Sequence, residues 1–344
     1  MIEPNDRFLR ACRRQTVDAT PIWLMRQAGR YMEEYRALRR RYSMLDLCRS
    51  PELSAEVTFQ PLRRFRLDAA IIFSDLLLPL EPLGLPFDFV KGEGPQVERP
   101  IRSAEDIDRL VPFDPREKLD HVLQAIRIVK AELQGRLPLI GFAGAPFTLA
   151  SYAIEGGHST HHAHVKAMMY GQPHDWHRLC DRLASMTADL LVAQAEAGAD
   201  ALQLFDSWVG HLSPADYREF VLPHTCRIFE ALRSTGVPAI HFGTGTATLL
   251  ELMAEAGGDV VGADWRIPLD DAWAKIGADR AIQGNLDPTL LLAPPDRLEA
   301  GARDVLRRAG GRPGHIFNLG HGILPETPLE RVEALIETVH GYKA

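Results

Sequence analysis

The chain has 344 residues, of which 46% are hydrophobic, and this is enough apolar material for one large domain or two medium ones. Its formal net charge of −7 and its isoelectric point near 6.0 indicate neither a nucleic acid nor an acidic membrane as a partner. The start of the chain lacks a secretory signal pattern, and the most apolar stretch, residues 69–80, is too short to cross a bilayer, so we expect a cytoplasmic protein.

Short aliphatic or β-branched runs recur along the chain, and each has the length of a buried strand. The eight runs are residues 21–25, 69–74, 137–143, 201–206, 237–243, 259–264, 280–285 and 315–320. The segments between them carry apolar residues at helical spacing, as in 183–195 and 249–254, whereas 79–100 is rich in Pro and Gly and predicts a loop or hairpin. This alternation predicts an α/β protein, a single (β/α)8 barrel covering residues 1–344, with a doubly wound sheet as the alternative.

Polar residues follow several of these runs, at the positions where a barrel places its active site, the C-terminal mouth of the strands. They are Arg26, Gln27 and Arg30 after the first run, Ser74 and Asp75 after the second, Asp206 and Ser207 after the fourth, Asn285 after the seventh and His321 after the eighth. A single Asp or Ser after a strand commonly caps a helix or forms a turn, and that alternative stays open for each of them.

Arg26 and Arg30 lie four residues apart directly after the first run, with Gly29 between them. Each guanidinium presents a planar set of donors that matches a carboxylate or a phosphate, and the glycine permits a tight turn or a close approach to a ligand. The pair therefore predicts an anion-binding loop. A pair of solvated arginines beside a turn is the alternative.

Eight segments of the chain, taken together and in order, carry a family resemblance. They are PIWLMRQAGRY at 21–31, CRSPEL at 48–53, QPLRRF at 60–65, LDAAIIFSDLL at 67–77, GFAGAPFTLASY at 141–152, FDSWVG at 205–210, GNLDP at 284–288 and FNLGHGILPETP at 317–328. With these segments the chain closely resembles the uroporphyrinogen decarboxylase family. The resemblance implies a distorted (β/α)8 barrel, a homodimer and a reaction without cofactor or metal, in which four acetate side chains of uroporphyrinogen III become methyls to give coproporphyrinogen III and four CO2 in haem biosynthesis.

The resemblance also implies roles for individual residues. The substrate-binding loop would consist of Arg26, Gln27, Ala28, Gly29 and Arg30, the central carboxylate would be Asp75, and further substrate contacts would be Tyr152, Ser207 and His321, with Arg39 as another basic position and Phe205 as an apolar one near the pyrroles.

The chemistry of such a reaction accounts for these residue types. Losing CO2 leaves an electron pair that many decarboxylases pass to a cofactor, but a pyrrole protonated at the ring carbon accepts it directly. A fixed carboxylate among the pyrrole N–H groups would stabilise the cationic intermediate, and Asp75 is the candidate. Arg26 is the candidate proton donor, with a relayed water or a substrate carboxyl as alternatives because a guanidinium is a weak acid. Tyr152, Ser207 and His321, the last either neutral or as a cation, would donate hydrogen bonds to carboxylates.

Two histidine patterns allow other interpretations. The cluster of His158, His161, His162 and His164 could indicate a metal site, but no Cys or carboxylate pattern completes it, and an exposed loop is the expectation. His224 and Cys226 resemble the ligand pair of zinc-dependent corrinoid or thiol methyltransferases of the same superfamily. No Cys follows Cys226, and the pair lies in a predicted helix, 213–233, so the methyltransferase is the alternative function.

Overall fold

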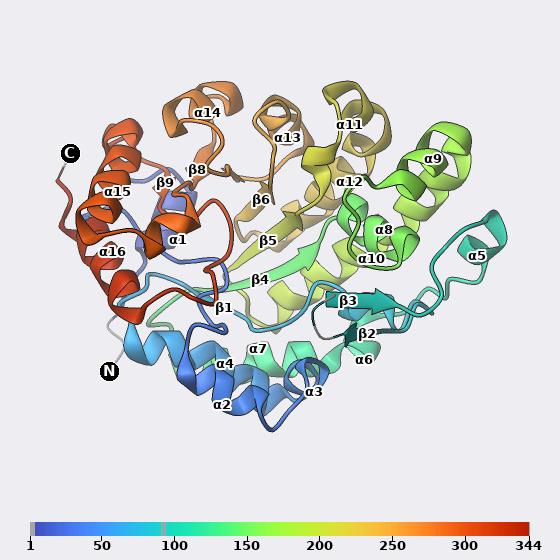
Figure 1. Ribbon diagram of the computed structural model, residues 1–344, viewed down its shortest axis with the longest axis horizontal. Coiled ribbons are helices and arrows are strands. Elements are labelled where there is room, and N and C mark those ends of the chain that lie inside the picture. Colours follow the sequence, from blue (N-terminus) through green and yellow to red (C-terminus); the bar gives the residue numbers. More distant parts are fainter. Residues whose placement is uncertain (1–3, 91, 93, 344) are drawn as a thin grey trace.

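A computed structural model describes residues 4–90, 92 and 94–343, so residues 1–3 and 344 of the predicted domain lie outside the described residues. Within the described part, seven strands form one curved, entirely parallel sheet in the order β1-β4-β5-β6-β7-β8-β9 (Figure 1). They are β1 (Ala70–Ile71), β4 (Leu139–Gly144), β5 (Ala201–Asp206), β6 (Ala239–Gly243), β7 (Val260–Gly262), β8 (Ala281–Gln283) and β9 (His315–Ile316). The neighbours follow chain order, which excludes the doubly wound alternative, because that fold reverses its strand order at a switch point.

Seven of the eight predicted runs thus contain a strand, but the prediction of a strand at 21–25 is wrong. That segment forms only an isolated parallel bridge, between Ile22 and Phe317. On its other side the Asp68 backbone N–H donates to the Ile22 carbonyl at 2.8 Å, so the segment lies between β9 and the start of β1. The sheet is a curved, barrel-like arc of seven strands.

Side chains explain why the segment 21–25 pairs so little. The Leu24 N–H donates to the side-chain oxygen of Gln27 at 3.2 Å, and the Met25 N–H donates to the side-chain oxygen of Asn318 at 3.0 Å. A backbone donor that is satisfied by a side chain does not contribute to a strand ladder. Sequence periodicity does not contain this information, because Asn318 is 293 residues away.

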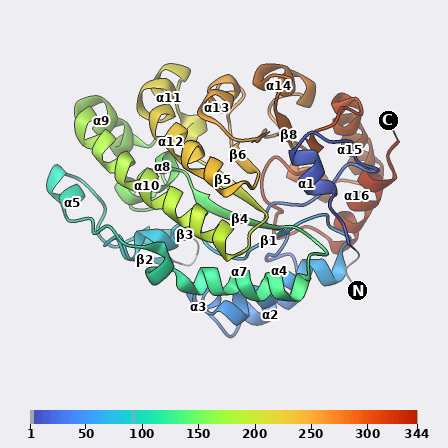
Figure 2. The same cartoon turned by 180° about the vertical axis from the view of Figure 1, so that it is seen from behind.

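Helices cover the outer side of the curved sheet, as the two opposite views show (Figure 1, Figure 2), except α1 (Arg7–Cys12), which packs on the apolar cluster on the inner side. The other helices are α2 (Glu33–Arg39), α3 (Met44–Arg49), α4 (Pro51–Arg64), α5 (Ala104–Asp108), α6 (Pro115–Lys118), α7 (Asp120–Leu133), α8 (Pro146–Glu155), α9 (Ala163–Gly171), α10 (Pro173–Ala197), α11 (Pro214–Phe220), α12 (Leu222–Leu232), α13 (Leu250–Ala256), α14 (Leu269–Ile276), α15 (Pro295–Ala309) and α16 (Leu329–Gly341). None of the helices in the described ranges is long and apolar enough to cross a membrane.

The Pro- and Gly-rich segment 79–100 contains the predicted hairpin. Strands β2 (Phe87–Val90) and β3 (Gly94–Val97) pair antiparallel, apart from the main sheet. The Val97 N–H donates to the Gly156 carbonyl at 2.7 Å, and this bond attaches the hairpin to the end of α8.

Apolar side chains pack on both faces of the curved sheet. The inner cluster includes Trp23, Ile140, Ile240 and Ile316, and Phe8 of α1 closes it from the end where the strands begin. A larger cluster fills the space between the outer face and the helices. Burial on both faces is typical of a parallel sheet covered by helices and explains the nearly continuous apolar runs of the sequence.

One buried histidine makes the stability depend on pH. His241 of β6 is fully buried, and burial lowers the pKa of its imidazole from 6.5 to about 4. The unfolded chain therefore takes up this proton at a higher pH than the folded chain, so the contribution is full above about pH 6.5 and is lost as the pH falls towards 4. Between pH 7 and pH 4.5 the wild type should lose about 2–3 kcal/mol relative to His241→Gln.

Denaturant unfolding at both pH values measures this difference, because the change relative to the variant isolates one histidine from the other titrating groups. His174→Gln, which replaces an exposed histidine, is the control and should unfold in parallel with the wild type. A stability difference between wild type and His241→Gln that stays constant with pH would contradict the assignment.

Candidate active site

The first and last segments of the chain meet at the C-terminal ends of the strands. The Met25 carbonyl accepts the Ile323 N–H at 2.9 Å, and the Met25 N–H donates to the side chain of Asn318. These bonds bring the loop after β9, with His321 and Gly322, beside Arg26. Residues nearly 300 positions apart in the chain therefore share one end of the sheet.

Arg26 lies at the centre of the predicted residues. Its backbone is in the left-handed region, with φ of 60°, a conformation rare outside Gly that concentrates at functional sites. Although the Arg26 side chain is exposed in the unliganded protein, desolvation by its surroundings and the charge of Arg30 lower the pKa of its guanidinium, and Tyr152 and Asp75 act on it in the opposite direction. Arg30 itself is exposed, and neither arginine forms an ion pair with another described residue, which leaves both forks free for an anion.

Gly322 determines where the stem of Arg26 runs. A Cβ at this glycine would stand 2.4 Å from Cδ and 2.6 Å from Cγ of Arg26. Because these atoms belong to a flexible side chain, Gly322→Ala should move the guanidinium without unfolding the protein. We expect kcat/KM to fall by about tenfold or more, since small displacements of catalytic groups are costly, while the melting temperature stays near that of the wild type. Gly171→Ala, whose Cβ would meet nothing within 4 Å, is the control, and a Gly322→Ala enzyme with normal kcat/KM would contradict the role.

Asp75 follows β1 and faces the same region. Its Oδ1 accepts the Leu77 N–H at 2.8 Å, so the turn-forming alternative is part of its role, and a 3-10 turn follows at Leu78–Leu80. Desolvation raises the pKa of the carboxyl, whereas the Leu77 N–H and the charge of Arg26 lower it. A carboxylate in such surroundings acts on a neighbouring cation more strongly than one in water.

Tyr152, Phe205 and Ser207 lie on neighbouring elements at this end of the sheet. The Tyr152 ring, on α8, packs edge-on against Trp208 at 5.9 Å, and its pKa is raised by burial and by Asp75. Phe205 of β5 contacts the rings of its neighbouring strands β4 and β6. Ser207 directly precedes Trp208 and is partly exposed. Tyr152 interacts electrostatically with both Arg26 and Asp75, and Phe205 and Ser207 lie at the C-terminal end of the neighbouring strand β5.

His321 is partly buried, and burial together with Arg26 and Arg266 lowers the pKa of its imidazole to about 4. At neutral pH the ring carries no charge. Burial and the two guanidinium groups thus favour the neutral imidazole in the unliganded protein, and binding of a substrate carboxylate by His321 as a cation stays a prediction. A neutral imidazole still donates one hydrogen bond.

Among the other predicted residues, Gln27 supports the loop rather than faces solvent. The Gln27 side chain is buried and bonds to the Leu24 N–H and the Ala69 carbonyl, so it fixes the loop to the sheet. Ala28 and Gly29 are partly exposed, and Arg39 donates to the Tyr42 carbonyl at 2.7 Å.

The structure adds residues that the sequence did not single out. Trp208 contacts Tyr152, and the buried Asn318 holds Met25. Arg266 is half-exposed, forms an ion pair with the buried Asp264, and acts electrostatically on His321. The position of Arg266 after β7 is a signal of the same kind that identified Asp75.

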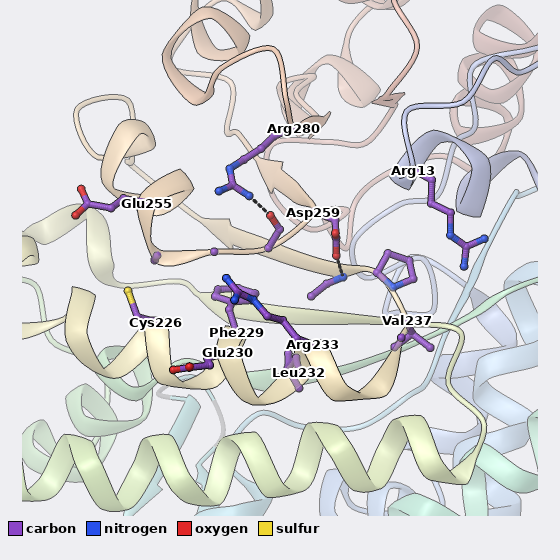
Figure 3. Close-up of a pocket in the computed structure, with 16 residues that line it drawn as sticks. Arg13, Cys226, Phe229, Glu230, Leu232, Arg233, Val237, Glu255, Asp259 and Arg280 are labelled. Atoms are coloured by element: carbon purple, nitrogen blue, oxygen red, sulfur yellow. Dashed lines mark hydrogen bonds between the residues drawn. The ribbon is translucent and has the colours of Figure 1, made fainter.

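One cavity of about 660 Å³ lies elsewhere, at the end of the sheet where β6, β7 and β8 begin (Figure 3). Phe229 and Leu232 of α12 line one side of it, and Asp259 and Arg280 line another. None of the predicted site residues borders this cavity.

The histidine patterns do not assemble a metal site. Among the described residues, no group of three or more His, Cys, Asp or Glu side chains is arranged to hold a metal ion. His158 and His161 lie on an exposed loop as expected, but the expectation is wrong for His164, which is exposed on α9, and for His162, which is buried against Trp208.

Both ring nitrogens of His224 contact neighbouring side chains. Its two ring nitrogens lie 3.0 Å from the carboxylate of Asp181 and 2.9 Å from the ring of His177. It belongs to α12, within the predicted helical stretch 213–233, together with Cys226. With both nitrogens occupied, the pair does not present the ligands that the methyltransferase alternative requires.

Comparison with known proteins concerns the family of the chain. The chain matches the family model described as uroporphyrinogen decarboxylase (URO-D) over residues 3–342. It is 58% identical over 337 residues to the uroporphyrinogen decarboxylase of Sorangium cellulosum, and 53% identical over 336 residues to that of Carboxydothermus hydrogenoformans; each match covers 98% of this chain and 96% of the relative.

Among solved structures, a methyltransferase from Methanosarcina mazei superposes with a TM-score of 0.82 over 98% of both chains. Its sequence is only 23% identical, so this likeness concerns the fold alone. The curated relatives and the family model span nearly the whole chain, and on that ground the chain belongs to the uroporphyrinogen decarboxylase family.

Proposed function

We propose that the protein decarboxylates the four acetate side chains of uroporphyrinogen III to methyls, which gives coproporphyrinogen III and four CO2 in haem biosynthesis. The observation that carries the proposal is the desolvated carboxylate of Asp75 beside the unpaired guanidinium of Arg26. One site then offers an anion for a developing pyrrole cation and cations for the carboxylates of the substrate.

The proposed role of Asp75 is electrostatic. Its free oxygen would accept hydrogen bonds from pyrrole N–H groups, and its charge would stabilise the ring after protonation. The Leu77 N–H holds the other oxygen in place, so the carboxylate needs little reorganisation during the reaction. The pyrrole itself accepts the electrons that CO2 leaves behind, so this scheme needs no cofactor.

Arg26 is the proposed proton donor to the ring carbon. The interaction of Arg26 with Asp75 supports this role, and because a guanidinium is a weak acid, a relayed water or a substrate carboxyl remains the alternative donor. Arg30 would bind substrate carboxylates as an exposed partner, and Tyr152, Ser207 and neutral His321 would donate hydrogen bonds to others. Arg39 and Phe205 are proposed to border the substrate, Arg39 as a further basic group and Phe205 near the pyrroles.

We further propose a single domain in which the segment 21–25 closes the arc of strands as the eighth side of a distorted (β/α)8 barrel. The bonds of Ile22 to Phe317 and Asp68 support this view. By family resemblance we propose a homodimer in the cytoplasm, with no nucleic-acid or membrane partner.

The test is anaerobic incubation of metal-stripped protein with uroporphyrinogen III, followed by oxidation and chromatography that counts the carboxylates per porphyrin. Stepwise loss from eight carboxylates to four is expected. Bound substrate without loss of CO2 would contradict the proposal, and near-stoichiometric zinc in the protein before it is stripped would then favour the methyltransferase alternative.

A further inference from the structure

A network of polar groups joins α8 to the end of β5. The Thr148 hydroxyl donates to Oδ1 of Asp206 at 2.7 Å and accepts the Trp208 N–H at 3.3 Å. Thr148 and Tyr152 lie four residues apart, on the same face of α8. Tyr152 packs against the ring of the same Trp208 whose backbone binds Thr148.

Asp206 is the acceptor of this network on β5. It is the last residue of β5, its side chain is fully buried, and Oδ2 has no hydrogen-bond partner among the described residues. Burial raises the pKa of the carboxyl to about 7, and the bonds from Thr148 act against that rise. Thr148 is thus the main polar partner of a group whose burial without a partner would be costly.

The two residues stand directly behind the proposed substrate contacts. Asp206 precedes Ser207 in the chain, and Thr148 precedes Tyr152 by one helical turn. The Thr148–Asp206 bond therefore joins the helix that carries Tyr152 to the strand end that carries Ser207, in addition to the bond from the Ala145 N–H to the Phe205 carbonyl before the helix. Because Asp206 and Thr148 are both fully buried, they act on substrate only through these neighbours.

We propose that Asp206 and Thr148 are positioning residues that hold Tyr152 and Ser207 at the spacing which substrate binding requires. This inference rests on the proposed function, in which Tyr152 and Ser207 contact uroporphyrinogen. Loss of the Thr148 hydroxyl lets α8 and the loop at Trp208 move apart, and the substrate contacts then no longer act together.

The experiment is a double-mutant cycle on kcat and KM for uroporphyrinogen III, with Thr148→Val, Tyr152→Phe and the double variant. Thr148→Val should raise KM about tenfold and change kcat by less than about threefold, because binding contacts are lost rather than the reacting groups. The double variant should be no more than about twofold worse than the poorer single variant, since both remove the same contact.

Two further variants separate positioning from stability. Thr148→Ser keeps the hydroxyl and should restore KM to within about twofold of the wild type. Thr187→Val removes another fully buried hydroxyl, which donates to the Gly144 carbonyl at 3.2 Å, and should leave KM unchanged whatever it costs in stability. If Thr148→Val does not fold, Thr148→Ser still tests the proposal. A KM of Thr148→Ser as high as that of Tyr152→Phe would overturn it, because Thr148→Ser keeps the hydroxyl.

Unchanged KM in a folded Thr148→Val, or effects of Thr148→Val and Tyr152→Phe that multiply independently, would overturn the positioning role while the wild type still decarboxylates. A wild type that releases no CO2 would instead refute the proposed function.

Discussion

Replacing Asp75 by asparagine should lower kcat for uroporphyrinogen about 10²–10³-fold, the usual effect of losing one electrostatic group aimed at a developing charge. KM should change far less than kcat, because the amide keeps the shape of the side chain and its bond to the Leu77 N–H, although its NH2 group no longer accepts the pyrrole N–H groups. Steady-state kinetics under anaerobic conditions measures both constants. The effect is large because desolvation strengthens the interaction of this carboxylate with a pyrrole cation.

Asp287→Asn is the matched control for this experiment. Asp287 is also partly exposed, accepts the N–H two residues ahead of it, here that of Thr289 at 2.9 Å, and also precedes a 3-10 turn, Pro288–Leu292. The control loses the same kind of charge at the same kind of turn and should keep kcat within about twofold. Near-normal turnover of Asp75→Asn would refute the electrostatic role and leave Asp75 as a turn former only.

Replacing Arg30 by alanine should weaken substrate binding by about 1–3 kcal/mol, which is about 5- to 150-fold in KM. The side chain is exposed and forms no ion pair in the described chain, so its removal breaks no internal contact. The loop that carries it stays in place through the Gly29 carbonyl, which accepts the Met32 N–H, and through the Arg30 carbonyl, which accepts the Arg36 guanidinium. Both bonds use main-chain oxygens that alanine retains.

Arg40→Ala is the control for Arg30→Ala. Arg40 is similarly exposed, and its partner is Glu33 rather than an external anion. Its loss should leave KM within about twofold, because an exposed ion pair contributes little. The binding affinity of Arg30→Ala, measured by fluorescence with a porphyrin bearing eight carboxylates, should fall in parallel with KM. If that affinity is unchanged, the arginine pair is not an anion clamp.

Whether a structural feature can be predicted from the sequence depends on how near in the chain its interacting residues lie. The run 201–206 coincides with β5. Both faces of the sheet are covered, so nearly every residue of this strand is buried, and such a run is visible in the local sequence. The run 21–25 has the same apolar character but is not a strand. Its donors bind Gln27 and Asn318, and no local pattern reveals that a distant side chain competes with the ladder.

For the site, too, some features follow from the local sequence and others only from the tertiary structure. The sequence alone determined the parallel α/β order of the strands and the presence of Arg26, Arg30 and Asp75 near strand ends, because these follow from residue type and spacing, and its eight quoted segments carried the family resemblance. Only the tertiary structure decided that Gln27 is a buried brace, that His321 is neutral and that Asp206 lies behind the site bound to Thr148. The protonation state of His321 depends on desolvation, and the bonds of Gln27 and Asp206 depend on residues far apart in the chain. Both exist only once the chain is folded.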